Sequence, residues 1–434
     1  MTHEQEAVWL ADHLDDGPSR YLESWAYRLS GRLDSDAVRW AVGRLVDRHE
    51  PLRTWLTVDA DRPVQVVLPG HDPPIECRTC PAATMDAVLS ETVSRPLDLR
   101  HSPLRVVLLR LAPDDTVLVI QFHHAAIDDW ALAVFGQEFG EFYRSRVTGS
   151  PPHLEPLPLQ LGEYALVQRS ASVAPGVLAY WRRRLTDFPK KNSPPPDHLR
   201  PATPSHLGGQ VQFRIDAEVA ELVRATCRAR RTTPFTVHAA ALTALLCHYN
   251  GTTEAILGTP VSHRDAALDH LVGCLTDLLP LRLAVRDIDS FADLVTSTRT
   301  VVWEAVANKA IPYTALISRA VARRELGTLP LCQTVLVMDD AGGPPFTLPD
   351  VTAERLYPHS GMAKFDLCVT LVTDGGGYRG FLEYARDLFT QQTAERIAAD
   401  LRAVLATALR LPDRPLSEVL TRAVPDPRRY VDAR

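Results

Sequence analysis

The chain has 434 residues, a length that favours two or three domains over one. Its composition, 45% hydrophobic and 23% charged, is typical of a globular protein and excludes a disordered or fibrous chain. With 47 Lys and Arg against 53 Asp and Glu, the formal net charge of -6 gives no excess of positive charge for a phosphate backbone to attract. Nucleic acid is therefore not expected as a partner.

The N-terminal residues show no basic patch followed by an apolar stretch, so no secretory signal is expected. The best apolar run, 239–246, is far shorter than the ~20 residues that cross a bilayer, so no membrane span is predicted. The 7 cysteines are scattered and odd in number, which favours a reducing compartment and a cytoplasmic location. Cys77 and Cys80 form a CxxC without a second pair, and no metal site is predicted.

The first half of the chain mixes predicted helices with predicted strands. Apolar residues at helical spacing predict a helix over 35–48, with Asp34 before it as a capping residue. Two β-branched and leucine-rich runs, 104–111 and 116–122, flank a turn sequence and predict a buried hairpin. A further helix is predicted over 130–146 from its apolar face.

A proline-rich segment, 187–209, interrupts the chain and ends in Gly208-Gly209. Such a segment can form neither a helix nor a central strand, so we interpret it as a linker. It separates two predicted domains, 1–186 and 210–434. The second is predicted to begin with helices at 216–230 and 234–249 and a strand at 254–259.

The most informative segment lies at the junction between the second strand of the hairpin and the helix that follows. It places His123 and His124 at the end of a strand, and Asp128 and Asp129 at a helix N-terminus, where carboxylates cap free N–H groups. A histidine in this position can act as a general base near neutral pH. The alternative from these residues alone is that both histidines are hydrogen-bonded core residues and Asp128 is only a cap.

This segment, His-His-x-x-x-Asp followed by Trp, resembles the HHxxxDG motif of nonribosomal peptide synthetase condensation domains, a superfamily that includes chloramphenicol acetyltransferase. Further segments resemble motifs of the same family, in the same order along nearly the whole chain: 4–10, 48–54, 258–264, 273–282, 311–313, 365–367 and 380–389.

The resemblance implies a mixed α/β fold of two chloramphenicol-acetyltransferase-like halves, arranged as a V-shaped pseudodimer with a central tunnel. It implies that a carrier-bound acyl thioester enters one side and an amine the other, and that an amide forms. No bound cofactor is implied, because phosphopantetheine arrives on a separate carrier protein. The product would belong to secondary metabolism, such as antibiotic biosynthesis.

The resemblance also implies roles for individual residues. His124, the second histidine, would deprotonate or orient the amine. His123 and Asp128 would be structural, and Asp128 would pair with Arg264 and so connect the two halves. The chemistry agrees with this reading, because an ammonium ion is not a nucleophile and must lose a proton before it attacks.

The chain departs from the family pattern close to the expected reaction centre. Asp129 replaces the motif glycine, Ala131 replaces the serine that follows Trp130, and Asp277 replaces an asparagine. Asp340 stands where the family commonly has an asparagine. Asp129, Trp130, Asp277 and Asp340 are therefore predicted to line the substrate tunnel.

Two functions remain open. In the first, the extra carboxylates select a cationic amine acceptor. In the second, the site is degenerate: some condensation-like domains of glycopeptide assembly lines carry a motif ending in Asp-Asp and recruit haem monooxygenases without forming a bond. We favour the enzyme because both histidines and Arg264 are retained. If the chain is free-standing, it would meet its carrier through a basic patch. Candidates for that patch are Arg20, Arg28 and Arg32 and the run Arg182, Arg183 and Arg184.

Overall fold

The computed structural model describes the chain except for residues 14–18, 60–61, 71–72, 74, 98, 100–101, 287–288, 321–328, 340–343 and 426–434. The described chain divides into two compact units. Unit 1 consists of Met1–Ser172, Ser262–Thr276 and Gly343–Gly361, and unit 2 of Val173–Val261, Asp277–Gly342 and Met362–Arg434. This division differs from the domains predicted at 1–186 and 210–434, because the segments 262–276 and 343–361 pack within unit 1.

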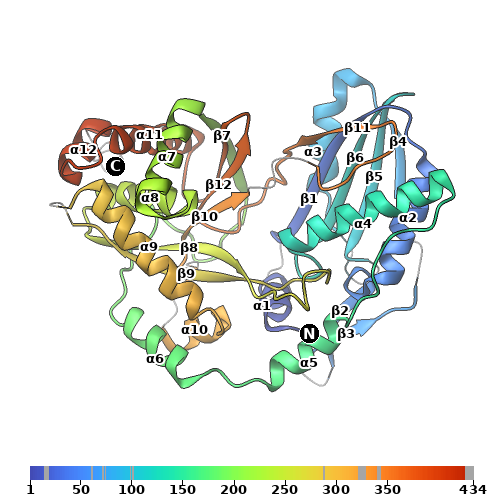
Figure 1. Cartoon of the computed structure of the whole chain (residues 1–434), viewed down its shortest axis with the longest axis horizontal. Coiled ribbons are helices and arrows are strands. Elements are labelled where there is room, and N and C mark those ends of the chain that lie inside the picture. The colour runs from blue at the N-terminus through green and yellow to red at the C-terminus, as the bar shows by residue number, and fades with distance from the viewer. Residues whose placement is uncertain are drawn as a thin grey trace. The chain divides into compact units, whose positions relative to one another are not determined.

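Unit 1 is built on a five-stranded sheet in the order β11-β1-β6-β5-β4 (Figure 1). Its strands are β1 (Leu22–Ser30), β4 (Ile75–Thr79), β5 (Leu104–Ala112), β6 (Asp115–His123) and β11 (Thr352–Leu356). Only β4 and β5 are parallel; the other neighbours are antiparallel. A separate hairpin consists of β2 (Thr54–Asp59) and β3 (Arg62–Val67). The predicted β5–β6 hairpin is confirmed, and β6 is buried along nearly its whole length in the centre of the sheet.

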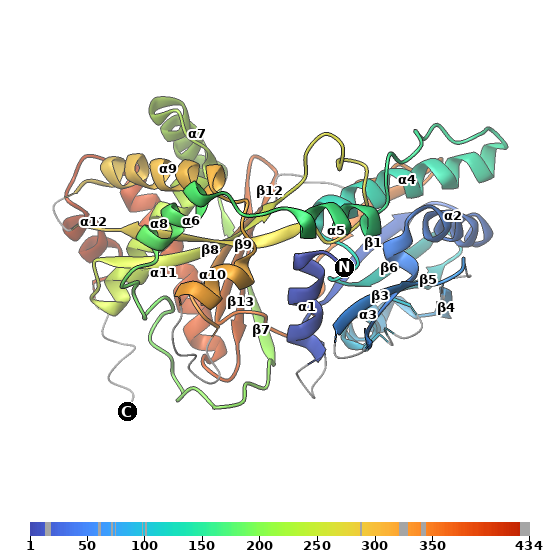
Figure 2. The same ribbon diagram turned by 90° about the horizontal axis from the view of Figure 1, so that it is seen from below.

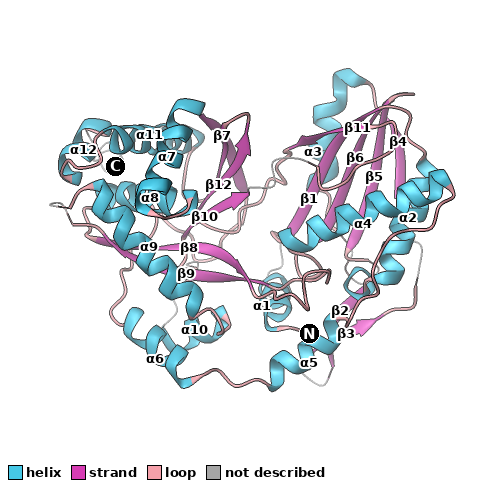
Figure 3. Cartoon of the chain, viewed as in Figure 1, coloured by secondary structure: helices cyan, strands magenta, loops and turns pink. Residues whose placement is uncertain are grey.

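Helices cover both faces of this sheet (Figure 3). The helices of unit 1 are α1 (His3–His13), α2 (Ser35–Arg48), α3 (Met85–Ser94), α4 (Asp129–Thr148) and α5 (Leu161–Ser170), with short 3-10 turns at Glu50–Arg53 and Ala82–Thr84. α2 and α4 pack into the core on one face, and α3 packs on the other. The predicted helix at 35–48 is confirmed, and its first N–H groups donate to the carboxylate of Asp34. The helix predicted at 130–146 is α4, which is slightly longer at both ends.

A buried ion cluster joins α2 to α4. The Glu138 carboxylate on α4 accepts hydrogen bonds from Nε of Arg48 at 3.0 and 3.1 Å and lies 2.7 Å from Nε2 of His49. The His49 ring is fully buried and the Glu138 side chain is 6% exposed. Arg48 and His49 belong to one of the segments that resemble a family motif, so part of that motif stabilises the scaffold of unit 1.

Unit 2 contains a mixed six-stranded sheet in the order β7-β13-β12-β10-β8-β9 (Figure 1). The strands are β7 (Gly208–Ile215), β8 (Glu254–Ser262), β9 (Thr276–Ala284), β10 (Thr334–Asp339), β12 (Leu367–Asp374) and β13 (Gly377–Ala385). β10 is parallel to both β8 and β12, whereas β13 is antiparallel to β12 and β7. The strand predicted at 254–259 is confirmed as the first part of β8.

Two groups of helices pack in unit 2. The larger core contains α7 (Ala217–Arg230), α8 (Pro234–Asn250), α9 (Phe291–Ala307), α11 (Gln391–Arg410) and α12 (Leu416–Ala423). A smaller core contains α6 (Pro175–Arg184) and α10 (Tyr313–Ala320), packed with residues of β8, β9 and β10. The predicted helices at 216–230 and 234–249 are confirmed as α7 and α8. Among the helices that the structure describes, none is long and apolar enough to cross a membrane.

The proline-rich segment has no helix or strand from residue 187 to residue 206. Its last two residues differ from the prediction, because Gly208 and Gly209 open the edge strand β7 and pair with Ala385 and Tyr384. A Cβ on Gly208 would lie 2.5 Å from the Met362 backbone, and one on Gly209 would lie 2.4 Å from the Tyr384 ring. Both glycines are therefore required by close packing at the start of the strand.

Candidate active site

The candidate site is the loop between β6 and α4 in unit 1. β6 ends at His123, and the backbone N–H of His124 donates to the Tyr21 carbonyl at 2.8 Å. Two turns follow, in which the N–H groups of Ala126 and Ile127 donate to the carbonyls of His123 and His124. The buried strand fixes the start of the loop and the N-terminus of α4 fixes its end, so His124 occupies a defined position.

His124 is half-buried and has the geometry of a base. Its Nδ1 lies 2.8 Å from the carbonyl oxygen of Ile127. Because a carbonyl can only accept, this contact assigns the ring proton to Nδ1 and leaves the lone pair on Nε2. Among the described residues, none makes a hydrogen bond to Nε2. The imidazole is thus oriented by its own loop, with the proton-accepting nitrogen uncommitted.

His123 is buried and attaches the loop to α1. Its Nε2 lies 3.2 Å from the Asp12 carboxylate, and its Nδ1 accepts from the N–H of Ala125 at 3.3 Å. Burial raises the pKa of Asp12, but the hydrogen bond and charge of His123, with Ser19 and Arg20, outweigh it and hold that pKa below its ordinary value. The arrangement gives His123 a structural part.

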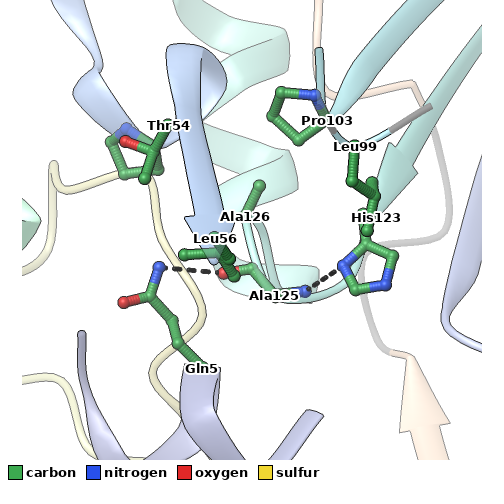
Figure 4. A pocket seen from close by; sticks show the side chains of 9 residues that line it. Gln5, Thr54, Leu56, Leu99, Pro103, His123, Ala125 and Ala126 are labelled. Atoms are coloured by element: carbon green, nitrogen blue, oxygen red, sulfur yellow. Dashed lines mark hydrogen bonds between the residues drawn. The ribbon is translucent and has the colours of Figure 1, made fainter. Parts of the chain in front are cut away.

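Gln5 attaches α1 to the same loop. Its Nε2 donates to the Ala125 carbonyl at 3.1 Å (Figure 4). Gln5, His123, Ala125 and Ala126 line a small, mostly apolar hollow together with Pro51, Thr54, Leu56, Leu99 and Pro103. No role was predicted for Gln5 or Asp12. Gln5 lies in a segment that resembles a family motif, but its partner could not be inferred from sequence.

Asp128 is the most heavily hydrogen-bonded residue of the loop. Its Oδ1 caps α4 by accepting from the N–H of Ala131 at 2.9 Å. Its Oδ2 accepts from Arg264 Nη1 at 2.8 Å, the N–H of Leu275 at 2.9 Å and Thr276 Oγ1 at 3.0 Å. The side chains of Asp128 and Arg264 are 0% and 2% exposed. The structure therefore brings the two residues together as a buried ion pair.

Arg264 organises the segment that carries it. Its Nη2 donates to the carbonyls of Leu271 and Gly273 at 2.9 and 3.0 Å. Since residues 262–276 belong to unit 1, the ion pair connects distant parts of the sequence but lies within one compact unit. Three hydrogen bonds that Asp128 accepts hold this segment against the loop that carries His124, and the two from Arg264 Nη2 brace the segment internally.

The other predicted site residues have different surroundings. Asp129 and Trp130 are exposed in the first turn of α4, and Trp130 donates from Nε1 to the Asp269 carbonyl at 3.0 Å. In unit 2, both carboxylate oxygens of Asp277 accept backbone N–H groups, from Leu278 at 2.8 Å and from Tyr313 at 2.7 Å. Asp340 lies outside the described residues.

Asp277 thus caps the N-terminus of α10, a partner that the sequence analysis did not foresee. The first N–H groups of a helix lack partners within the helix, and a carboxylate there is favoured by the helix dipole. The residue that begins α10, Tyr313, is buried and donates from its hydroxyl to the Pro330 carbonyl at 2.5 Å. Burial raises the pKa of Tyr313 well above its ordinary value. The negative charge of Asp277 is therefore already used to hold local structure.

Comparison with known families identifies the class of protein. The condensation-domain family model matches residues 1–424, so the chain belongs to that family. The predicted mixed α/β condensation-domain fold is confirmed. The chain is 32% identical to the probable non-canonical nonribosomal peptide synthetase CymA of Salinispora arenicola over 96% of its length, and 32% identical to phosphinothricin tripeptide synthetase PhsC of Streptomyces viridochromogenes over 94%. It spans only 6% and 39% of those two proteins.

Two solved structures of similar length resemble the chain. The X-domain from teicoplanin biosynthesis has a TM-score of 0.86 and 27% identity, with 96% of each chain covered. The SgcC5 protein from Streptomyces globisporus has a TM-score of 0.82 and 28% identity, with 95% of this chain and 99% of that chain covered. Both similarities extend over nearly the entire fold.

Proposed function

We propose that this chain transfers an acyl group from a carrier-bound thioester to an amine and forms an amide. The observation that carries the proposal is the geometry of His124, whose Nδ1 proton is held by the Ile127 carbonyl and whose Nε2 makes no hydrogen bond with any described residue. In the step, the amine nitrogen attacks the thioester carbonyl and the C–S bond breaks. His124 accepts the proton that the amine loses and returns it to the departing thiolate, so charge and protons balance.

The surrounding residues support this role by fixing the loop. Asp128 and Arg264 hold the loop and the segment 262–276 in one arrangement, and His123 and Gln5 connect it to α1. Rigid support of a catalytic side chain is what orientation of two reactants requires. We assign positioning roles to His123, Asp128 and Arg264.

We further propose that the acceptor is cationic. Asp129 lies five residues after His124 and is exposed at the start of α4, where a positively charged amine can approach its carboxylate. Both oxygens of Asp277 already accept backbone N–H groups, so we assign the preference to Asp129 for its exposure and its place beside the loop in sequence.

A second function is favoured by one observation, the similarity to the teicoplanin X-domain over 96% of both chains. That X-domain has also been solved in complex with OxyB. Under this alternative the chain binds a tailoring oxygenase, and the loop that carries His124 performs no chemistry.

Discharge of an acylated carrier protein tests the proposal. The chain is mixed with the loaded carrier and a panel of monoamines and diamines, and intact-mass analysis follows loss of the acyl group. We expect discharge by the unaltered chain, at least a hundredfold less by His124→Ala, and no change for His270→Ala, an exposed histidine of the same unit. Equal discharge by His124→Ala would contradict the catalytic role. Absence of discharge together with capture of a purified haem oxygenase would establish the alternative.

The cationic preference has its own test. Asp129→Asn should lower the ratio of diamine-derived amide to monoamine-derived amide by about tenfold, since a charge-assisted hydrogen bond contributes about 1.5–3 kcal/mol. Asp269→Asn, on the neighbouring segment of unit 1, is the matched control. A ratio unchanged by Asp129→Asn would exclude the preference.

A further inference from the structure

Helix α1 carries two polar side chains on its inward face. Gln5, Trp9 and Asp12 are spaced four and three residues apart, which places them on one side of this helix, drawn in dark blue in Figure 2. Gln5 and Trp9 are buried, and the Asp12 side chain is 14% exposed. Buried polar groups need hydrogen-bond partners. Both Gln5 and Asp12 find theirs in the loop that carries His124, about two helical turns apart along α1.

The first contact is made by Gln5, whose amide has a fixed orientation. The N–H of Gln5 donates to Thr2 Oγ1 at 3.1 Å, and the N–H of Thr2 donates to Gln5 Oε1 at 3.0 Å, which is a reciprocal cap of α1. Because the amide oxygen is used in this cap, the NH₂ group is left for the loop and donates to the Ala125 carbonyl (Figure 4). The residue that follows His124 is therefore held through its C=O group.

The second contact is made by Asp12 through the ring of His123. The N–H of Ala125 donates to His123 Nδ1 at 3.3 Å, so this nitrogen carries a lone pair and the ring proton lies on Nε2 (Figure 4). His123 Nε2 lies 3.2 Å from the carboxylate of Asp12, which accepts that proton's hydrogen bond. Two contacts on opposite sides of the ring thus define one neutral tautomer of His123.

The two neighbouring histidines are held in opposite tautomers. His124 carries its proton on Nδ1, facing the Ile127 carbonyl, whereas His123 carries its proton on Nε2. A proton on Nδ1 of His123 would face the N–H of Ala125, and the bond between them would be lost. An unpaired buried donor costs about 1–3 kcal/mol. The tautomer of His123 is therefore coupled to the position of the residue directly after His124.

We infer that Asp12 is a positioning residue for the proposed reaction: its carboxylate holds His123 in the Nε2–H tautomer, and His123 in that state holds the N–H of Ala125 beside His124. The effect on rate rests on the proposed function. A hydrogen bond to an ionised carboxylate is stronger than one to a neutral acceptor. Ser19 and Arg20 favour the ionised form, because they act with His123 to hold the pKa of Asp12 below its ordinary value.

Nuclear magnetic resonance reads the tautomers directly. Long-range ¹H–¹⁵N correlations of a chain labelled at histidine show which ring nitrogen is protonated, and His123→Asn and His124→Ala identify the two sets of signals by their loss. We expect the Nε2–H form of His123 in the unaltered chain. Asp12→Asn keeps an oxygen acceptor and should preserve it, whereas Asp12→Leu and Asp12→Ala should shift or broaden the ring signals of both histidines. Asp36→Leu, at an exposed position of α2, is the matched control and should change neither.

Kinetics of carrier discharge distinguish positioning from loss of folding. Asp12→Leu and Asp12→Ala should lower kcat by about 10–100-fold, with KM for the acylated carrier unchanged, and Asp12→Asn should keep most of the rate. In a His123→Asn background, Asp12→Leu should lower kcat by less than about twofold more, because Asp12 acts through His123. Circular dichroism checks that each variant is folded. If Asp12→Leu does not fold, Asp12→Ala supplies the same comparison.

The outcomes separate this inference from the catalytic proposal. Unchanged ring signals of His123 and His124 in folded Asp12→Leu or Asp12→Ala overturn the inference, whatever the rate. An unchanged kcat in these variants, or equal losses from Asp12→Leu with and without His123, overturns it as well. If even the unaltered chain discharges no carrier, the catalytic proposal fails. The ring signals then decide alone, and their shift in Asp12→Leu but not in Asp12→Asn supports the positioning of His124 by Asp12.

Discussion

Replacing Asp128 by asparagine isolates the buried network beneath the candidate site. In the native loop, Oδ2 of Asp128 accepts three hydrogen bonds and Oδ1 accepts one. An asparagine offers one oxygen and one NH₂ group, so in either orientation the NH₂ faces donors that it cannot satisfy. The guanidinium of Arg264 also loses its charge partner in a site where its side chain is 2% exposed.

The magnitude follows from burial. Removing one partner of a buried ion pair costs about 3–5 kcal/mol, because the other charge stays buried and uncompensated. If the asparagine keeps its oxygen toward Arg264, part of the ion-pair penalty is avoided. The N-terminus of α4 then loses its cap, which costs about 1 kcal/mol. For a unit of about 200 residues, a loss of about 3–5 kcal/mol lowers the melting temperature by about 6–20 °C.

Urea unfolding followed by circular dichroism measures this loss. Asp129→Asn, the exposed neighbouring residue, is the matched control and should change stability by less than about 0.5 kcal/mol. Arg264→Met and the double variant complete a mutant cycle, in which we expect a coupling energy of about 1–3 kcal/mol. A loss below about 1 kcal/mol in Asp128→Asn, or additive effects in the cycle, would refute the structural role of this pair.

Three further predictions concern residues outside the loop. Glu138→Gln should lower the free energy of unfolding by about 3–5 kcal/mol, because it breaks the buried cluster with Arg48 and His49. The control is Glu141→Gln on the same helix, whose partner Arg144 is partly exposed and whose loss should be less than about 1 kcal/mol. Equal losses of stability in urea titrations would contradict the role of the cluster. Burial lowers the pKa of His238 to about 3 from 6.5, so the unfolded chain binds more protons between these values and stability falls as pH drops below 6.5. At pH 5 His238 should lower the free energy of unfolding by about 2 kcal/mol relative to pH 8, and His238→Met should not show this pH-dependent loss. If both proteins show the same pH dependence of stability, the buried neutral state of His238 is excluded. Burial raises the pKa of the Cys332 thiol to about 12, so iodoacetamide at pH 8 should label the exposed Cys77 and leave native Cys332 unmodified in a peptide map.

Local elements could be predicted well because their signals are local. The range 35–48 matched α2 because the apolar spacing and the Asp34 cap both lie within one short segment. The loop that carries His124 was located for the same reason, since the end of a buried strand, two histidines and a capping aspartate occur within the eight residues 121–128. Asp128 was also expected to cap the helix, and the hydrogen bond from the N–H of Ala131 to its carboxylate confirms this.

Long-range partners could not be predicted from local patterns. β11 pairs with β1 across more than 300 residues, which is why the segment 343–361 belongs to unit 1 rather than to the later half of the chain. The bond from Gln5 to the Ala125 carbonyl and the cap that Asp277 provides to α10 depend on tertiary placement. A carboxylate in place of an asparagine at 277 suggested a charged binding site, but its oxygens meet backbone N–H groups of the same unit.

The charge of Asp129 is independent of the architecture of the loop. Residue 129 is the first helical residue of α4 and is exposed, and Asp129 is not among the described residues with a positive φ angle. A glycine is not needed there for backbone reasons, and an aspartate in the first turn of a helix is favoured by the helix dipole. The scaffold around His124, including Asp128, Arg264 and His123, can therefore form whether or not residue 129 carries a charge. Folding of the loop therefore does not depend on residue 129, and catalysis and recruitment must be distinguished by chemistry rather than by stability.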